Sequence, residues 1–372
     1  GCMSSLTQKS KTGEFCVFPP IGHFVLQWHI TERCNRRCAH CYQEGAASDE
    51  LQFHDLLKVI EQFKDLLSRF NFSVTRHSSA RGQINITGGE PFIREDFLDL
   101  LEVFHSNRDL FSFAIFTNGS YIDEAMAIRL RKLHPVFVQV SMEGAKETND
   151  SIRGPGAYDQ TVVALRHLTK QKVPTLISFT AHKKNYREFA EVARLGRELG
   201  VRRVWSDRLI PWGTGTVLRD DVLSPAETRE FFEIMYRAHN EAMQAFSGTE
   251  VAMHRALQFL VGGGKAYACA AGKSLLAVMP NGDLYPCRRM PIHAGNLMED
   301  SLSDLYRGSD ILHKLRNQDF VSKGCEECIF FSRCRGGLRC LSYALTGTPF
   351  HADPGCWRAR PANHRQPPEC RC

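Results

Sequence analysis

The feature that most constrains the fold is a regular alternation of short apolar segments with amphipathic segments between residues 24 and 210. The apolar segments have the length and composition of β-strands, and apolar residues recur at helical spacing between them. The expected strands are residues 24–30, 83–87, 111–117, 136–142, 175–182 and 203–211. The expected helices lie near residues 53–70, 95–106, 123–133, 157–171 and 186–199. This alternation predicts an α/β fold with a parallel sheet, whose chemistry belongs at the C-terminal ends of the strands.

Three cysteines follow the first expected strand. Cys34, Cys38 and Cys41 form a C-x3-C-x2-C run, and the aromatic residue Tyr42 comes directly after it. A [4Fe–4S] cluster is normally held by four cysteine thiolates. Three thiolates would therefore leave one iron open to a small molecule that binds through nitrogen and oxygen. The alternatives are a zinc site or three structural cysteines, although zinc sites usually use paired C-x2-C spacings.

A glycine-rich turn, Gly88-Gly89-Glu90-Pro91, ends the second expected strand. Two glycines let backbone carbonyls approach a ligand without an intervening Cβ, and Glu90 supplies an acceptor for an ammonium group. The cysteine run and this turn together resemble the radical S-adenosylmethionine (AdoMet) family, in which the GGEP turn receives the AdoMet amino group. The resemblance implies a partial (β/α)6 barrel over residues 24–220.

The same resemblance implies further contacts to AdoMet. Tyr42, Asn118 and Pro91 would belong to the cofactor site, and Ser141 and Arg153 would approach the ribose and the carboxylate. A guanidinium suits a carboxylate because its fork binds both oxygens. The alternative for Arg153 is a solvated loop. Two histidines flank the cysteine run: we expect His29 to pack within its strand and His40 to shield the iron site from water.

A second set of cysteines lies near the C-terminus. Its spacing is C-x12-G-x4-C from Cys269 to Cys287, then C-x2-C-x5-C from Cys325 to Cys334. This pattern resembles the SPASM domain, a cysteine-rich module with auxiliary clusters that is attached to radical AdoMet enzymes that mature peptides and proteins. The resemblance implies one outer and one inner [4Fe–4S] cluster. Their ligands would be Cys325, Cys328, Cys334 and Cys356 for the outer cluster, and Cys269, Cys287 and Cys340 for the inner one.

One position departs from the SPASM pattern, because Leu338 stands where the family has a cysteine and Cys340 follows two residues later. Either Cys340 substitutes through a small backbone shift or the inner cluster lacks that ligand. A zinc ribbon made by Cys325, Cys328, Cys334 and Cys340 is the alternative. Cys2, Cys16, Cys370 and Cys372 match no position of the family.

The rest of the chain completes the expected organisation. Residues 1–23 form an N-terminal extension, residues 221–268 a helical bridge that begins at the N-cap Ser224, residues 269–356 the SPASM domain and residues 357–372 a tail. The 14 cysteines stand mostly in metal-type spacings, no signal peptide is visible and no apolar run spans a membrane, which together favour the cytoplasm. The formal charge of +6 would be nearly cancelled by clusters on thiolates, so nucleic-acid binding is not expected.

The resemblance implies an enzyme that reductively cleaves AdoMet to a 5′-deoxyadenosyl radical and modifies a ribosomally synthesised peptide. The modification would be a thioether or carbon–carbon cross-link, or an epimerisation. The expected partners are the peptide or protein substrate and a reductant such as flavodoxin or ferredoxin. Few residues precede the first strand, so binding of a leader peptide would come from a separate leader-binding protein or from the catalytic domain.

Two other functions remain open. One is the oxidation of a sulfatase residue to formylglycine, where the family has an aspartate base directly after the cysteine that corresponds to Cys287. Here that position is Arg288. The other is a non-catalytic iron–sulfur electron carrier or redox sensor, which would need neither the GGEP turn nor an open iron.

Overall fold

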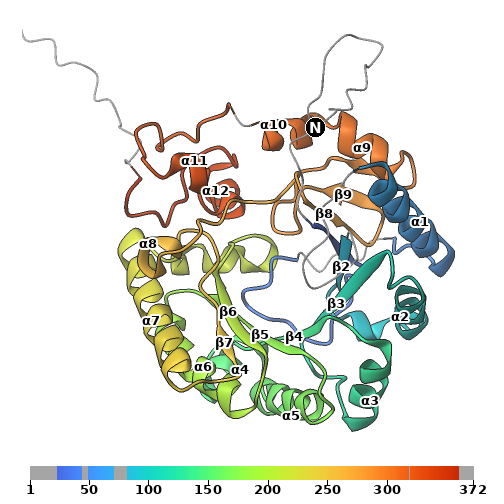
Figure 1. Ribbon diagram of the computed structural model, residues 1–372, viewed down its shortest axis with the longest axis horizontal. Helices are drawn as coiled ribbons and strands as arrows, with labels where there is room; N and C mark the ends of the chain where they lie inside the picture. The colour runs from blue at the N-terminus through green and yellow to red at the C-terminus, as the bar shows by residue number, and fades with distance from the viewer. Residues whose placement is uncertain (1–22, 44–48, 71–81, 318, 360–372) are drawn as a thin grey trace, which may run out of the picture.

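The computed structural model describes residues 23–43, 49–70, 82–317 and 319–359 (Figure 1). Cys2, Cys16, Cys370 and Cys372 therefore lie outside the described residues, as do most of the expected N-terminal extension and C-terminal tail. No helix within the described ranges is long and apolar enough to cross a membrane.

Ten strands of the described residues form one sheet, in the order β10-β9-β8-β1-β2-β3-β4-β5-β6-β7. The pairs from β8 through β1 to β7 are parallel, whereas β9 and β10 add antiparallel strands at one edge. The strands are β1 (Phe24–His29), β2 (Gly82–Thr87), β3 (Phe111–Thr117), β4 (Phe137–Ser141), β5 (Thr175–Ala181), β6 (Arg203–Arg208), β7 (Glu250–Val251), β8 (Leu275–Val278), β9 (Asp283–Tyr285) and β10 (Gly295–Asn296). The predicted α/β fold with a parallel sheet is confirmed.

Helices cover the outside of this curved sheet (Figure 1). Around β1 to β6 they are α1 (Phe53–Arg69), α2 (Phe97–Ser106), α3 (Glu124–Leu133), α4 (Lys146–Arg153), α5 (Ala157–Lys170) and α6 (Phe189–Glu198). The remaining helices are α7 (Pro225–Gln244), α8 (Phe259–Gly262), α9 (Leu302–Gly308), α10 (Asp310–Arg316), α11 (Phe331–Cys334) and α12 (Arg339–Thr346). Three short 3-10 segments are η1 (Pro91–Ile93), η2 (Tyr186–Glu188) and η3 (Gly213–Asp221).

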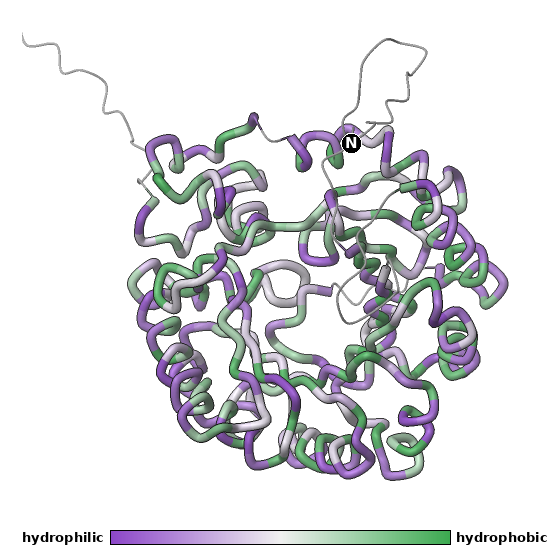
Figure 2. The backbone as a smooth tube through the Cα atoms, viewed as in Figure 1, coloured by the Kyte–Doolittle hydropathy of each residue, from purple (hydrophilic) through white to green (hydrophobic). Residues whose placement is uncertain are grey.

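The hydrophobic core forms where the helices pack on the sheet. Figure 2 shows the alternation of hydrophilic and hydrophobic residues along the surrounding helices. On α1 the apolar stripe predicted from the sequence is buried, and its Phe63 ring lies 6.1 Å from the ring of Phe24 and 5.7 Å from that of Phe111. Such aromatic contacts stabilise the helix on the sheet beyond the burial of their area.

Helix α7 begins where the sequence predicts. The Ser224 hydroxyl accepts from the Glu227 amide at 3.2 Å, and the Glu227 carboxylate accepts from the Ser224 amide at 2.8 Å. Pro225 occupies the first turn. This capping box satisfies two amides that the helix leaves unpaired, and such N-caps contribute roughly 1 kcal/mol.

Two segments after α7 form strands of the sheet that the sequence did not predict. The expected helical bridge contains β7, which pairs with β6. The start of the expected SPASM domain contains β8, which pairs in parallel with β1. Strands of two and four residues carry too little pattern to predict, but they cover edges that would otherwise leave backbone groups unpaired. The C-terminal region is thus joined to the barrel by backbone hydrogen bonds.

Candidate functional site

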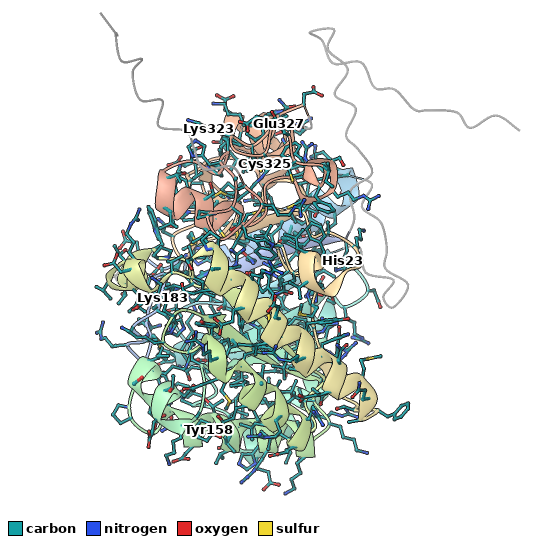
Figure 3. All side chains as sticks on the ribbon, turned by 90° about the vertical axis from the view of Figure 1, so that its left-hand side faces the viewer. His23, Tyr158, Lys183, Lys323, Cys325 and Glu327 are labelled. Carbon is teal, nitrogen blue, oxygen red and sulfur yellow. The ribbon has the colours of Figure 1, made fainter. Side chains whose placement is uncertain are left out.

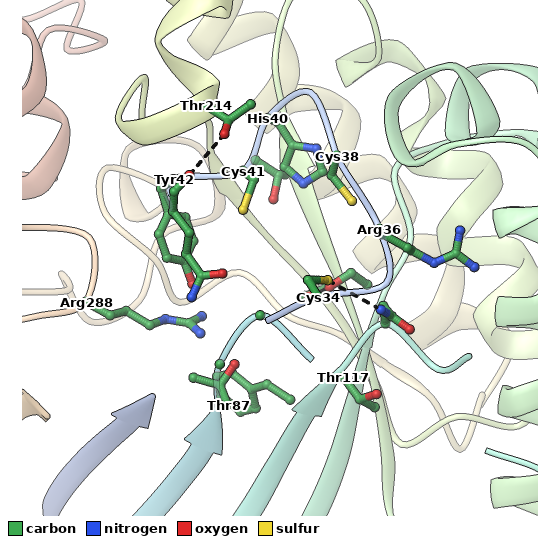
Figure 4. Close-up of a pocket in the computed structure, with 18 of the residues that line it drawn as sticks. Cys34, Arg36, Cys38, His40, Cys41, Tyr42, Thr87, Thr117, Thr214 and Arg288 are labelled. Carbon is green, nitrogen blue, oxygen red and sulfur yellow. Dashed lines mark hydrogen bonds between the residues drawn. The ribbon is translucent and has the colours of Figure 1, made fainter. Parts of the chain in front are cut away.

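A cavity of about 830 Å³ opens at the C-terminal ends of the parallel strands (Figure 4). Its wall includes the loop that carries Cys34, Cys38 and Cys41. The ends of the strands contribute Thr87, Phe116, Thr117, Gln139, Ser141, Ser178, Phe179, Thr180, Trp205, Asp207 and Arg208. Volumes of this order hold small-molecule ligands. The predicted position of the site, at the C-terminal ends of the strands, agrees with this cavity.

The three cysteines of the first run face the cavity together, and none forms a disulfide. Burial raises the pKa of Cys34, and it raises the pKa of Cys41 to about 11. Each of these thiols is also influenced by the charge of Cys38, so the three lie close to one another. The donor set is therefore entirely sulfur and stands in a cavity of cofactor size, as a cluster with cysteine ligands requires.

The two glycines of the GGEP turn support the cysteine loop. The Gly89 amide donates to the Thr31 carbonyl at 2.8 Å, and the Glu90 amide donates to the Arg33 carbonyl at 2.9 Å. A Cβ on Gly88 would lie 2.7 Å from the Thr31 carbonyl oxygen, and one on Gly89 would lie 2.3 Å from that of Arg33. The space that the glycines leave is thus filled by the protein's own backbone, although both glycines also line the cavity.

Glu90 lies elsewhere than expected. Its carboxylate is fully buried and accepts from the Thr117 hydroxyl and the Asn118 amide, both at 2.8 Å. Burial raises the pKa of Glu90 to about 7, against the opposing effect of these hydrogen bonds. Glu90 is not among the residues that line the cavity, and neither is Pro91. In this structure Glu90 ties the turn after β2 to the end of β3, so it positions the site and does not present a free acceptor.

Glu143, just beyond β4, joins the cysteine loop to α4. Its Oε1 lies 3.2 Å from His40 Nε2 and accepts from Arg153 Nη1 at 3.1 Å, while its Oε2 accepts from the Thr180 amide at 2.7 Å. Burial opposes ionisation of Glu143, but His40 and Arg153 outweigh it and hold the pKa below its usual value. Arg153 is therefore the buried last residue of α4 and not part of a solvated loop.

Two further predicted residues lie at the cavity. The Asn118 side chain donates to Asn35 Oδ1 at 2.9 Å and lies 3.9 Å from Cys34 Sγ. Ser141 lines the wall and accepts a 3.4 Å hydrogen bond from the Ser178 hydroxyl. Asn118 thus contacts the cysteine loop, whereas Ser141 presents its hydroxyl to the cavity.

The far end of the cysteine loop is held by η3, which the sequence analysis missed. The Gly215 amide donates to the Cys41 carbonyl at 2.6 Å, and the Thr214 amide and hydroxyl donate to the Gln43 carbonyl at 3.1 and 3.0 Å. Gly213 has a φ of 57°, and a Cβ there would lie 2.4 Å from the Tyr42 carbonyl oxygen. Figure 4 shows Thr214 above this part of the loop. The Gly-Thr-Gly sequence after the sixth strand was the signal that could have indicated this close approach of two backbones.

Asp207, Arg288 and Arg289 add charged groups to the cavity wall. Asp207 accepts from Arg255 at 2.7 Å and from Arg289 at 2.7 Å. Burial disfavours the charge on Asp207, but the two guanidiniums hold its pKa far below the usual range. The neighbouring Arg288 lies over two rings, 5.4 Å from the centre of Tyr42 and 4.9 Å from that of Phe116. Burial raises the pKa of Tyr42.

The C-terminal cysteines fall into two groups. Burial raises the pKa of Cys340 well above its usual value, and the charges of Cys287 and Cys269 add to this effect. In the second group, burial raises the pKa of Cys325 to about 12, with contributions from Cys356, Cys328 and Cys334. Figure 3 shows Cys325 in the C-terminal region, beside Lys323 and Glu327. The charges that act on Cys340 and on Cys325 thus come from the inner and the outer set respectively, and the assignment of these cysteines as cluster ligands stays a prediction.

A structural zinc site needs four ligands around a single centre. The zinc ribbon would require Cys340 beside Cys325, Cys328 and Cys334, whereas the charges that act most on Cys340 are those of Arg289, Cys287, Asp207 and Cys269. Leu338, which replaces the expected cysteine, is buried among apolar residues, whereas Cys340 on α12 faces Cys287.

Two family models match the chain. Residues 28–196 match the Radical SAM superfamily, and residues 269–329 match the SPASM iron–sulfur cluster-binding domain. The first match spans β1 to α6, and the second includes Cys269, Cys287, Cys325 and Cys328.

Several curated proteins resemble nearly the whole chain. The AdoMet-dependent heme synthase of Methanosarcina barkeri is 26% identical, over 89% of this chain and 95% of its own length. The mycofactocin maturase MftC of Mycolicibacterium smegmatis is 28% identical, over 89% and 82%. The PqqA peptide cyclase of Granulibacter bethesdensis is 26% identical, over 93% and 89%. The names of these relatives thus refer to two classes of enzyme, one that acts on peptides and one that makes heme.

A solved structure has the same fold. SuiB of Streptococcus suis, solved with S-adenosylmethionine, superposes with a TM-score of 0.70 at 17% identity and covers 91% of this chain and 77% of its own. SuiB has also been solved bound to the precursor peptide SuiA, with a TM-score of 0.68 at 17% identity, over 90% of this chain and 75% of its own. At this identity the comparison establishes the fold alone.

Proposed function

Because this chain belongs to the radical SAM superfamily and carries a SPASM domain, we propose that it binds AdoMet in the cavity and modifies a peptide there. The observation that carries the proposal is the grouping of Cys34, Cys38 and Cys41 on one loop that faces this cavity. The three thiols can ligate a [4Fe–4S] cluster that leaves one iron without a cysteine. Bound there, the cluster would supply the electron that cleaves AdoMet.

The residues around the cysteines would hold AdoMet in place. Gly88 and Gly89 present backbone to the cavity, Ser141 presents a hydroxyl, and Arg153 presents a guanidinium that Glu143 fixes at 3.1 Å. We assign these residues to the polar ends of AdoMet, since amino, hydroxyl and carboxylate groups need such partners. Glu90 and Asn118 would act as positioning residues, because their hydrogen bonds connect the turn after β2 with the end of β3.

The auxiliary cysteines would hold two further [4Fe–4S] clusters. Cys269, Cys287 and Cys340 are the proposed ligands of the inner cluster, and Cys325, Cys328, Cys334 and Cys356 those of the outer cluster. Their thiols have raised pKa values when no cluster is bound, so loading must displace protons. These clusters would exchange electrons with the substrate, and an external flavodoxin or ferredoxin would supply the reducing equivalents.

The proposed substrate is a ribosomally synthesised peptide, with a cross-link or an epimerisation as the outcome. The names of the PqqA peptide cyclase and of the SuiB–SuiA complex support this class. Formylglycine formation is less favoured, because an arginine cannot serve as the base at position 288. A tetrapyrrole is the second candidate, since a heme synthase resembles 89% of this chain.

The test uses protein whose clusters have been reconstituted anaerobically. Reduced enzyme and AdoMet are incubated separately with the small peptide encoded beside the gene and with coproporphyrin III. We expect 5′-deoxyadenosine and a peptide that is either about 2 Da lighter, for a cross-link, or unchanged in mass with one inverted residue. Conversion of the tetrapyrrole alone would replace the peptide proposal with the second candidate. Absence of 5′-deoxyadenosine would contradict the AdoMet chemistry itself.

A further inference from the structure

Arg288 lines the cavity and has no carboxylate partner among the described residues. Arg153 pairs with Glu143 at 3.1 Å, Arg208 with Asp353 at 2.6 Å, and both Arg255 and Arg289 with Asp207 at 2.7 Å. A charge that is taken out of water needs such a partner, because desolvation without one is costly. Arg339 also lacks a carboxylate partner among the described residues, but its guanidinium donates to the Leu315 carbonyl at 3.1 Å and is not part of the cavity wall. Arg288 lines the cavity, so its unpaired charge requires an explanation there.

The position of Arg288 is well defined. Its amide donates to Gln27 Oε1 at 3.1 Å, and the same oxygen lies 3.5 Å from Cys287 Sγ. From there the side chain enters the cavity and lies over the rings of Tyr42 and Phe116. Figure 4 shows the guanidinium reaching into the cavity from the side of the C-terminal region, below Tyr42. Its Nε is buried and has no acceptor within the described part of the chain.

Asp207, which lines the same cavity, cannot serve as its partner, because it already accepts from Arg255 and Arg289. The guanidinium of Arg288 thus keeps donors available on the cavity side, while aromatic rings cover part of it. A planar fork beside two rings favours a carboxylate that is attached to an apolar group.

We propose that Arg288 binds a carboxylate of the substrate and that Tyr42 and Phe116 contact the apolar group attached to it. The inference rests on the proposed function in one respect, namely that the substrate enters this cavity. The chemistry has two possible sources, a carboxylate of a peptide or a propionate of a tetrapyrrole. In either case the site discriminates by charge, so an amide or ester of the same shape binds more weakly.

The first experiment needs no variant. The cluster-loaded protein with AdoMet is treated anaerobically with phenylglyoxal, which modifies guanidinium groups, and modification at position 288 is mapped by mass spectrometry. We expect 3-phenylpropionate to protect Arg288 and 3-phenylpropanamide, its neutral analogue, to leave it reactive. Equal protection by both, or by neither, would overturn the proposal.

The second experiment measures binding of the same two probes by ligand-observed NMR. Arg288→Gln should weaken binding of the carboxylate about ten- to hundredfold, as for the loss of a charged hydrogen-bonded pair, and change binding of the amide much less. Arg288→Lys keeps the charge but loses the fork, so its effect should be intermediate. Arg166→Gln is the control, because Arg166 is an exposed arginine on α5 that is not among the residues lining the cavity. The control should retain the preference for the carboxylate.

A third comparison distinguishes the two sources. N-acetyl-Ala-Phe is tested against its C-terminal carboxamide, and coproporphyrin III against its tetramethyl ester. A charge preference that is lost in Arg288→Gln for the peptide pair identifies a peptide carboxylate, and the same result for the porphyrin pair identifies a propionate. Retention of both preferences in Arg288→Gln would assign the guanidinium to the cluster at Cys287 instead and refute the proposal. These readouts do not depend on turnover, so a failure of the proposed peptide reaction would be recognised separately.

Discussion

Arg208 and Asp353 form a bidentate ion pair between the end of β6 and the C-terminal region, with N–O distances of 2.7 and 2.6 Å. Both side chains are almost completely buried, with exposures of 2% and 1%. Asp353 also accepts from the amides of Leu338 and Gly355, which adjoin the segments that carry Cys340 and Cys356. A single carboxylate therefore connects the barrel to both proposed auxiliary clusters.

Asp353→Ala should destabilise the protein by about 3–5 kcal/mol, because it leaves the charge of Arg208 buried without a partner. We also expect a loss of iron from the C-terminal region. The measurements are anaerobic thermal unfolding and the iron content of the reconstituted variant. Asp159→Ala, which removes an exposed ion pair with Lys146, is the control. It should change neither the thermal stability nor the iron content. Wild-type stability and iron in Asp353→Ala would show that the pair does not connect the two regions.

Replacing Cys34, Cys38 and Cys41 together by alanine should abolish the formation of 5′-deoxyadenosine. The iron content should fall from about twelve to about eight atoms per chain, because the C-terminal cysteines form separate groups. Iron analysis and a dithionite-driven AdoMet cleavage assay test this result. Continued cleavage of AdoMet by the triple variant would place the catalytic cluster elsewhere.

Cys340→Ala should remove about four irons, because Cys340 faces Cys287 and Cys269 across the proposed inner cluster. The measurement is iron content together with the electron paramagnetic resonance spectrum of the reduced protein. Cys328→Ala, in the outer group, provides the comparison, since its loss should affect a different signal. Unchanged iron and spectra in Cys340→Ala would mean that the inner cluster uses only two of these cysteines.

Gly89→Ala should disturb the cysteine loop, because the added Cβ would lie 2.3 Å from the Arg33 carbonyl oxygen. We expect a destabilisation of about 1–3 kcal/mol from overpacking and a lower iron content at Cys34, Cys38 and Cys41. Gly308→Ala is the matched control, since no atom lies within 4 Å of the Cβ that it would add. Normal iron loading in Gly89→Ala would refute the supporting role of this turn.

His29 should make stability depend on pH. Burial, assisted by the charge of Arg288, lowers the pKa of His29 to about 3, and Nδ1 accepts from the Gln43 side chain at 2.9 Å. Below about pH 6.5 the unfolded chain binds a proton at this histidine, whereas the folded protein does not. The free energy of unfolding therefore falls as the pH falls, with a slope that approaches about 1.4 kcal/mol per pH unit well below pH 6.5.

His29→Gln removes this titration. Its stability deficit relative to the wild type, measured by anaerobic thermal unfolding, should therefore be largest at pH 7.5 and should shrink by about 1 kcal/mol between pH 6.5 and 5.5. A deficit that stays constant over this range would show that folding does not lower the pKa of His29.

Much of the fold and of the site follows from the sequence because the signals are local. The six predicted strands β1 to β6 and the start of α7 at Ser224 agree with the structure within a few residues. Alternating apolar segments and a capping box are properties of neighbouring residues, so they can be read without tertiary information. The spacing of the cysteines also separated the two C-terminal groups, in which Cys340 is influenced by Cys287 and Cys269, and Cys325 by Cys356, Cys328 and Cys334.

The remaining features depend on contacts between distant segments. Glu90 faces the end of β3 and not the cavity, Glu143 joins His40 to Arg153, and β8 pairs with β1. None of these relations has a signature in the local sequence, because each depends on which strand ends converge once the sheet curves. The sequence by itself determined the element order and the chemistry of the donors. Only the tertiary structure decided which charges are paired, and it left Arg288 facing the cavity without a carboxylate among the described residues.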